Sequence, residues 1–278
     1  MTNQLDHQEA EKLKQIEMDL LKTFISICQE LNLRYYVIGG TLLGAVRHKG
    51  FIPWDDDIDV AMPRADYEIW IKKAQDLIDK DHYFVQTFLS DPYYPANFAK
   101  LRNCKTTFIE SSLRNLNINH GAYIDVFPLD YYPQKIDVFK LKQFCLTSKI
   151  TQAYDTDAIS YSKSKKIIRK LASIPVFGTP FDAVKKREKL YKSVTHGKLL
   201  ANHCGAWGIK EVVPAEWYGE GKTLKFEGID VSVPQKYHSW LHRVYGDYMK
   251  LPPEEKRVTH HYTEVIDLDR PYTDYMRG

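Results

Sequence analysis

Two aspartates, Asp57 and Asp59, are the residues of this 278-residue chain best suited to chemistry. In the segment Asp57–Met62, acidic and apolar residues alternate with the period of a β-strand, so both carboxylates are expected on the same face. Two like charges that close are costly unless a cation lies between them, and carboxylate oxygens suit Mg²⁺, or Mn²⁺ in its place. The spacing therefore predicts a divalent metal site at Asp57 and Asp59.

A glycine pair, Gly39-Gly40, lies upstream of these acids and is followed by Thr41. Glycines let the backbone approach a phosphate closely, and a short helix that begins at Thr41 would direct its N–H groups and its dipole at that anion. We expect the phosphate cradle and the metal carboxylates to form one site. The alternative is a hairpin turn and a separate solvated acidic loop, which would explain either half alone but not their combination.

A third carboxylate is expected from a neighbouring strand. Asp125 interrupts the otherwise apolar run Tyr123–Phe127, where a buried acid is expensive unless it is paired or bound to a metal. We predict that Asp125 completes the metal site; the alternative is an ion pair with an arginine of the core. Asp55 is expected to play a supporting role, since it follows Pro53-Trp54 and should lie in a loop.

Basic residues near these motifs are candidates for binding phosphate. Arg47 and His48 follow the expected short helix, and a guanidinium is well suited to phosphate oxygens. Lys100 and Arg102 alternate on one face of an expected strand and could serve the same ligand, or could form a solvated face. His120, just before the Asp125 strand, is a weaker candidate for a base.

The elements that must position these residues form an α+β pattern, a small mixed sheet with flanking helices followed by a mainly helical lobe. Residues 1–134 are expected to form the catalytic core and 135–278 the lobe, packed together as one unit. The expected helices are an amphipathic one ending near Asn32, Thr41–Arg47 and one carrying Tyr67 to Ile78, with a helical pattern over 135–197. The expected strands are Tyr35–Ile38, Asp57–Met62, Tyr83–Phe88, Thr106–Glu110, Tyr123–Phe127 (ending at Pro128) and a hairpin, Thr223–Phe226 with Asp230–Val233.

The net charge of +3 conceals an asymmetry. The stretch Tyr161–Lys198 holds eleven Lys or Arg against Asp182 and Glu188, a net charge of +9. Such a stretch could contact an anionic membrane peripherally, or could be an ordinary solvated helical face. The beginning of the chain lacks the pattern of a signal peptide, and its four cysteines lack metal-ligand spacing, so we expect a cytoplasmic location and free thiols.

Three blocks of sequence resemble the LicD family. The first runs from Tyr36 to Pro63, the second from Ile124 to Asp130, and the third combines Phe226-Glu227-Gly228 with Tyr245–Met249 and Leu251–Pro253. The first block is the most specific, and together the blocks span most of the chain. The zinc-binding cysteines of the animal relatives, the fukutin-related proteins, have no counterpart here, so no zinc is expected.

The resemblance implies a nucleotidyltransferase-like fold and a phosphotransferase. A phospho-alcohol, most often phosphocholine, would move from a CDP-activated donor to a hydroxyl of a glycan such as lipopolysaccharide or a lipid-linked teichoic acid precursor, releasing CMP. In that reaction Asp125 would orient or deprotonate the hydroxyl, and an aromatic cage would suit choline. No nucleic acid partner is expected. Two alternatives are a nucleotidyltransferase that uses NTP and acts on RNA or a small molecule, and a non-catalytic glycan-binding module.

Overall fold

The computed structural model describes residues 6–133, 164, 167, 179–259 and 262–276. Its main sheet is mixed, with strand order β1-β2-β6-β4-β3, and β7 and β8 continue it beyond the far end of β6. These strands are β1 (Tyr36–Val37), β2 (Asp59–Pro63), β3 (Tyr83–Gln86), β4 (Ala99–Asn103), β6 (Ala122–Tyr131), β7 (Leu199–Ala201) and β8 (Val213–Pro214). The expected α+β class is confirmed.

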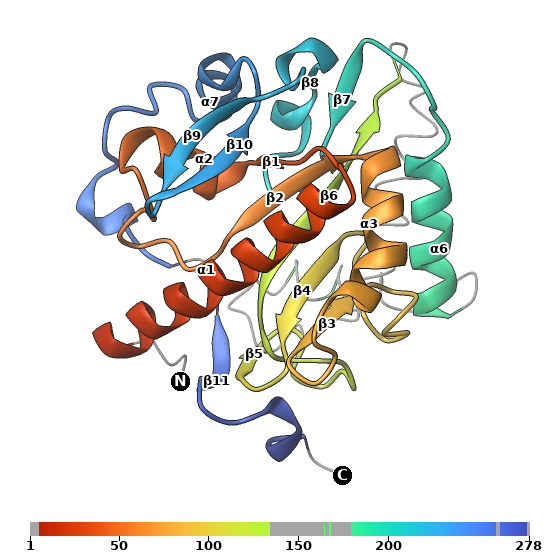
Figure 1. The fold of residues 1–278 in the computed structure, drawn as a ribbon, viewed down its shortest axis with the longest axis vertical. Helices are drawn as coiled ribbons and strands as arrows, with labels where there is room; N and C mark the ends of the chain where they lie inside the picture. The colour runs from red at the N-terminus through yellow and green to blue at the C-terminus, as the bar shows by residue number, and fades with distance from the viewer. Residues whose placement is uncertain (1–5, 134–163, 165–166, 168–178, 260–261, 277–278) are drawn as a thin grey trace.

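Two smaller antiparallel pairs flank this sheet. They join β5 (Thr107–Glu110) to β11 (Thr263–Asp267), and β9 (Lys222–Phe226) to β10 (Ile229–Val233). The helices are α1 (His7–Glu30), α2 (Gly39–Arg47), α3 (Arg64–Leu77), α6 (Pro180–Tyr191) and α7 (Tyr237–Tyr245), with short 3₁₀ turns at Gly208–Glu211, Ala215–Trp217, Glu254–Lys256 and Tyr272–Asp274. Figure 1 shows α1 lying across the sheet, with α3 beside it and the β9–β10 hairpin near α2.

Helix α1 begins and ends as its sequence indicates. Asp6 and Glu9 form a reciprocal capping box, in which each side chain accepts a hydrogen bond from the other's backbone N–H. Beyond the last turn, Asn32 adopts a left-handed conformation with φ of 53°. The apolar face carrying Leu20, Leu21 and Phe24 is fully buried in the main core, and this burial fixes the helix on the sheet.

Strand β6 is longer than the sequence indicates. It was expected to end at Pro128, but it continues to Tyr131. The reason lies in its neighbours: β4 pairs with β6 only as far as Val126, and β7 begins pairing at Asp130. Pro128 therefore falls where neither antiparallel strand faces it, and its missing N–H is tolerated there.

The β9–β10 hairpin was expected and is confirmed. Its turn residues, Glu227 and Gly228, both have positive φ, 47° and 80°, as a two-residue hairpin turn requires. The turn is attached to the segment after α2: the Glu227 N–H donates to the Lys49 carbonyl at 3.0 Å, and the Phe51 N–H donates to Glu227 Oε1 at 3.0 Å. A C-terminal hairpin thereby holds the segment that leads into the acidic loop.

A network of opposite charges joins α3, β6 and α6. Arg64 donates two hydrogen bonds to Asp130, at 2.7 and 2.5 Å, and a third to Glu188 at 2.6 Å. The Asp130 side chain is only 2% exposed. Asn97 donates to the other carboxylate oxygen of Glu188 at 3.0 Å. This network fixes α6 against the main sheet.

Candidate active site

Three side chains that the sequence marks as functional lie in a row across adjacent strands. In the parallel ladder between β2 and β6, Asp59 is opposite Asp125, and in the antiparallel ladder between β6 and β4, Asp125 is opposite Lys100. Side chains at matched positions of neighbouring strands lie on the same face of a sheet, roughly 5 Å apart. The sheet thus brings together two carboxylates and one ammonium group.

Asp125 forms a buried ion pair with Lys100. The Lys100 Nζ donates to Asp125 Oδ1 at 2.7 Å, and the two side chains are 5% and 10% exposed. The same ammonium lies 3.2 Å from the centre of the Tyr123 ring, a cation–π contact. The structural alternative raised for Asp125 is therefore present, with a lysine as partner where an arginine was considered.

Asp59 is held by Thr41, at the start of α2. The Asp59 N–H donates to Thr41 Oγ1 at 2.9 Å, and Thr41 is almost fully buried. Burial raises the pKa of Asp59 well above its ordinary value, and the neighbouring carboxylates of Asp57 and Asp125 raise it further. The charged form of this carboxylate is therefore less favourable here than in water.

Asp57 does not lie in a strand, and this part of the prediction is wrong. Strand β2 begins at Asp59, and Asp57 belongs to the preceding loop. The parallel pairing extends one residue into that loop, since the Asp125 N–H donates to the Ile58 carbonyl at 2.9 Å. Asp57 nevertheless lies close enough to raise the pKa of Asp59, and a shared metal site of the two acids stays a prediction.

Helix α2 begins earlier than the sequence indicates, at Gly39 and not at Thr41. Carboxylates lie beside both glycines: a Cβ on Gly39 would collide with Asp59, and one on Gly40 would collide with Asp55. The glycine pair therefore makes room for two acids at the positive end of the helix. The binding of a phosphate by Gly39, Gly40 and Thr41 stays a prediction.

Arg47 is the last residue of α2, and His48 caps the C-terminal end of the helix. Arg47 Nη1 donates to the Tyr248 carbonyl at 2.7 Å, and its Nε contacts His48 Nδ1 at 3.4 Å. Burial, with a smaller effect from Arg47, lowers the pKa of His48, which favours the neutral imidazole. A guanidinium has five N–H donors, so this contact still allows Arg47 to bind a phosphate, and that role stays a prediction.

The donor set fits a hard divalent cation, though not as a complete protein cage. Asp57 and Asp59 supply carboxylate oxygens, and the pKa of Asp59 is raised first by burial and then by the neighbouring carboxylates. Across the described ranges, however, no three His, Cys, Asp or Glu side chains are grouped closely enough to hold a metal ion by themselves. A Mg²⁺ ion held here would take the rest of its shell from water and substrate phosphate, as Mg²⁺ commonly does.

Two residues of the C-terminal region that were not predicted as site residues, Tyr245 and Glu211, also influence the site. Burial raises the pKa of Tyr245, and Asp59 and Asp55 raise it further, so the phenol faces the acids. Glu211 is 2% exposed, accepts a hydrogen bond from the Trp207 N–H at 3.0 Å, and has its pKa raised by burial to about 7. Tyr245 lies in a family-like block and could have been noticed, but no local pattern marks Glu211.

Other candidates lie elsewhere or have structural partners. His120 is buried, and its Nε2 contacts the Leu116 carbonyl at 3.0 Å. Arg102 donates to Gln86 and to the Gly121 carbonyl, both at 2.6 Å. Two aromatic residues near the motifs that a choline cage could use are also engaged: Tyr94 is fully buried, and Trp54 has the Arg257 guanidinium 5.5 Å from its ring centre.

Several predictions fall wholly or partly outside the described residues. They include the first part of the basic stretch Tyr161–Lys198, much of the helical pattern over 135–197 and Cys145. The other cysteines, Cys28, Cys104 and Cys204, are free thiols. No helix in the described part of the chain is both long enough and apolar enough to cross a membrane.

Comparisons with known proteins agree with this geometry. Residues 32–183 match the family model described as LicD/FKTN/FKRP, nucleotidyltransferase domain. The chain is 30% identical over 265 residues to the lipopolysaccharide cholinephosphotransferase LicD of Haemophilus influenzae, covering 90% of this chain and 95% of the relative. It is also 28% identical over 130 residues to an uncharacterized protein of Rickettsia prowazekii, covering 45% of this chain and 44% of that one. The chain that carries this row of acids therefore belongs to the LicD family.

Proposed function

We propose that this protein is a Mg²⁺-dependent phosphotransferase that moves phosphocholine from CDP-choline to a hydroxyl of a cell-surface glycan. The observation that carries the proposal is the cluster of Asp57, Asp59 and Asp125, in which burial and like charges raise the pKa of Asp59 and which a divalent cation would neutralise. Similarity over nearly the whole length to a protein named lipopolysaccharide cholinephosphotransferase supports choline as the alcohol and lipopolysaccharide as the acceptor.

In the proposed reaction, the acceptor hydroxyl oxygen attacks the phosphorus that bears choline. The bond from that phosphorus to the bridging oxygen breaks, and CMP leaves with the bridging oxygen. The hydroxyl proton passes to a carboxylate of the cluster, for which Asp125 is our candidate, and then to solvent. Mg²⁺ would supply charge neutralisation at the phosphates and acidify the hydroxyl.

Residues of this chain would divide the remaining tasks. Asp57 and Asp59 would hold the cation, and Thr41 orients Asp59 by accepting its N–H. Lys100 fixes Asp125 from the opposite side, so that its carboxylate keeps one orientation. Arg47, at the end of α2, would contact the donor diphosphate.

The test is to incubate the purified protein with CDP-choline, CDP-ribitol or CDP-glycerol and Mg²⁺, and to measure CMP. We expect CMP from CDP-choline, faster with a glycan acceptor, and none after chelation with EDTA. Pyrophosphate released from an NTP, with no CMP from any CDP-alcohol, would instead identify a nucleotidyltransferase. Absence of both products with intact protein would favour the non-catalytic binding module.

A further inference from the structure

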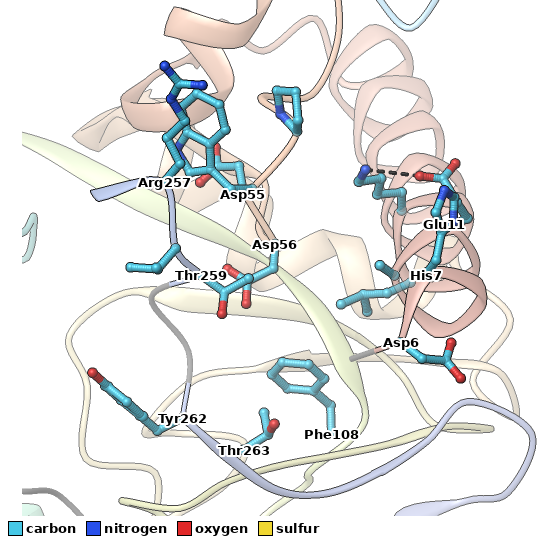
Figure 2. Close-up of a pocket in the computed structure, with 16 residues that line it drawn as sticks. Asp6, His7, Glu11, Asp55, Asp56, Phe108, Arg257, Thr259, Tyr262 and Thr263 are labelled. Atoms are coloured by element: carbon cyan, nitrogen blue, oxygen red, sulfur yellow. Dashed lines mark hydrogen bonds and ion pairs between the residues drawn. The ribbon is translucent and has the colours of Figure 1, made fainter. Parts of the chain in front are cut away.

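A cavity of about 570 Å³ adjoins the acidic loop on the side of α1. Loop residues Asp55 and Asp56 form one wall, the N-terminal turns of α1 form the opposite wall, and Phe108 of β5 contributes to the floor. Figure 2 shows the Asp56 carboxylate and the Phe108 ring facing the same space, with Tyr262 at its edge. The next acids along the chain, Asp57 and Asp59, belong to the candidate active site, so a molecule in this cavity would lie beside it.

The side chains around the cavity are those that bind neutral sugars. Aromatic rings can cover the C–H faces of a pyranose, and carboxylates accept strong hydrogen bonds from its hydroxyls. The lining provides both kinds, together with the hydroxyls of two threonines. These residues are Trp54, Phe108 and Tyr262, then Asp55 and Asp56, and then Thr259 and Thr263.

The charges around the cavity argue against an anionic ligand. Four carboxylates line it, and its two permanent cations already have partners. Lys14 Nζ donates to Glu11 at 3.0 Å, while Arg257 donates to the Pro252 carbonyl at 2.9 Å and covers the Trp54 ring. A nucleoside diphosphate would therefore meet more repulsion than attraction here.

Size and ring occupancy argue against the choline headgroup as the main occupant. A trimethylammonium group needs a small box of open ring faces, whereas this cavity lies within the range of sites for drug-sized molecules, roughly 300–1,000 Å³. One face of Trp54 is already occupied by the guanidinium of Arg257. A mono- or disaccharide matches the volume and the lining better.

We propose that this cavity binds the neutral sugar of the acceptor glycan, with the reacting hydroxyl directed past Asp55 toward Asp57 and Asp59. The proposal rests on the proposed function in one respect, because it supplies the acceptor half of that reaction. It assigns the donor to the α2 side of the acidic loop and the acceptor to the α1 side. The loop itself would separate the two substrates.

The test compares two reactions of one enzyme, hydrolysis of CDP-choline by water and transfer to a dephosphorylated lipopolysaccharide core oligosaccharide. Tyr262→Ala and Asp56→Asn should each raise the KM for the oligosaccharide at least about fivefold, while CMP release into water stays within about twofold of wild type. Tyr93→Ala is the matched control, because Tyr93 is similarly exposed, 65% against 56% for Tyr262, and lies outside the cavity. Melting curves of all three variants establish that each one folds.

Binding of the oligosaccharide, read by saturation-transfer NMR, gives a result that does not depend on turnover. Wild-type protein and Tyr93→Ala should bind it, and Tyr262→Ala should lose most of the signal. If neither donor nor oligosaccharide is turned over yet this binding pattern holds, the proposed function fails and the cavity assignment stands. Unchanged KM and binding in both cavity variants, or an equal loss of CDP-choline hydrolysis, would overturn the assignment.

Discussion

Strand β6 carries two buried aspartates, Asp125 and Asp130, whose surroundings have opposite electrostatic character. Asp130 is bound by two donors of Arg64, which also contacts Glu188, so positive and negative groups alternate. Burial by itself would lower the pKa of Arg64, but the carboxylate of Asp130 outweighs it and the pKa is raised. Asp125 has Lys100 on one side but Asp59 on the other, and there burial and like charges together raise the pKa of Asp59.

The two clusters differ in how their charges are balanced. Around Asp130, the guanidinium of Arg64 lies between the carboxylates of Asp130 and Glu188, so both acids have a cationic partner within the protein. Around Asp125, the protein concentrates carboxylates at a helix N-terminus and supplies one close ammonium from β4. Like charges held so close raise the free energy of the folded protein, and a bound cation would lower it, as the proposed function requires.

The largest effect should come from the acids at the start of α2. Asp57→Asn or Asp59→Asn should reduce CMP release by about a thousandfold or more, because a cation that stabilises the transition state is lost. Melting without Mg²⁺ should be unchanged or raised for Asp59→Asn, since a repulsive charge is removed. Near-normal turnover in both variants would show that the acids around Asp125 are no more important for catalysis than those around Asp130.

Substitution of Asp125 should reduce both the activity and the stability of the protein, and a double variant can separate these two effects. Asp125→Asn should abolish CMP release and, by leaving the Lys100 ammonium buried beside a neutral amide, destabilise the protein by roughly 3–5 kcal/mol. Adding Lys100→Met should recover much of the stability but none of the activity. Urea unfolding and CMP release of the three variants check this, and recovery of both properties would assign Asp125 to the fold alone.

Asp130→Asn should affect stability and leave the chemistry largely intact. The change breaks a buried pair with Arg64, at a cost of roughly 3–5 kcal/mol at most, because Glu188 still contacts the guanidinium. Specific activity per folded molecule, measured well below the melting temperature, should fall less than about threefold. A collapse of CMP release in a fully folded sample would place Asp130 in the active site.

The smallest effect should appear at Glu211, as a dependence of stability on pH. Its pKa is raised to about 7 in the folded protein, so between the ordinary value of 4.5 and about 7 the folded state binds more protons than the unfolded state. Stability should therefore fall as the pH rises through this window, by roughly 2–3 kcal/mol. Glu211→Gln keeps an acceptor for the Trp207 N–H and should lack this fall in stability. If the stability of variant and wild type changed in parallel from pH 4 to 8, Glu211 would not be the group responsible.

Local patterns predicted the elements that bury a regular apolar face or contain a distinctive turn. The amphipathic face of α1, the helix carrying Tyr67 and Trp70, and the hairpin with Glu227-Gly228 are confirmed because each depends on residues close in sequence. The extent of β6 was wrong because the strands that pair with it decide whether Pro128 is tolerated. The same limit applies to Asp57, where the sheet begins two residues later than the alternation indicates.

The candidate site shows the same division. The glycine pair and the acids could be found because they form a compact motif, and the structure places Asp59 and Asp125 on paired positions of neighbouring strands. Other features depend on contacts between segments that are distant in the sequence. They are the ion pair of Lys100 with Asp125, the packing of Asp55 against Gly40, and the approach of Tyr245 and Glu211 to the acids. No spacing within the sequence carries that information.

The attachment of the β9–β10 turn to the segment after α2 has a consequence for biosynthesis. The backbone groups of Lys49 and Phe51 are hydrogen-bonded by the N–H and the carboxylate of Glu227, which leaves the ribosome only after most of the chain has been made. Contacts between residues so far apart form late, because a long loop must close before they repay its entropy. During translation, the segment that leads into the acidic loop therefore lacks these two hydrogen bonds until the β9–β10 hairpin has been synthesised and has folded against it.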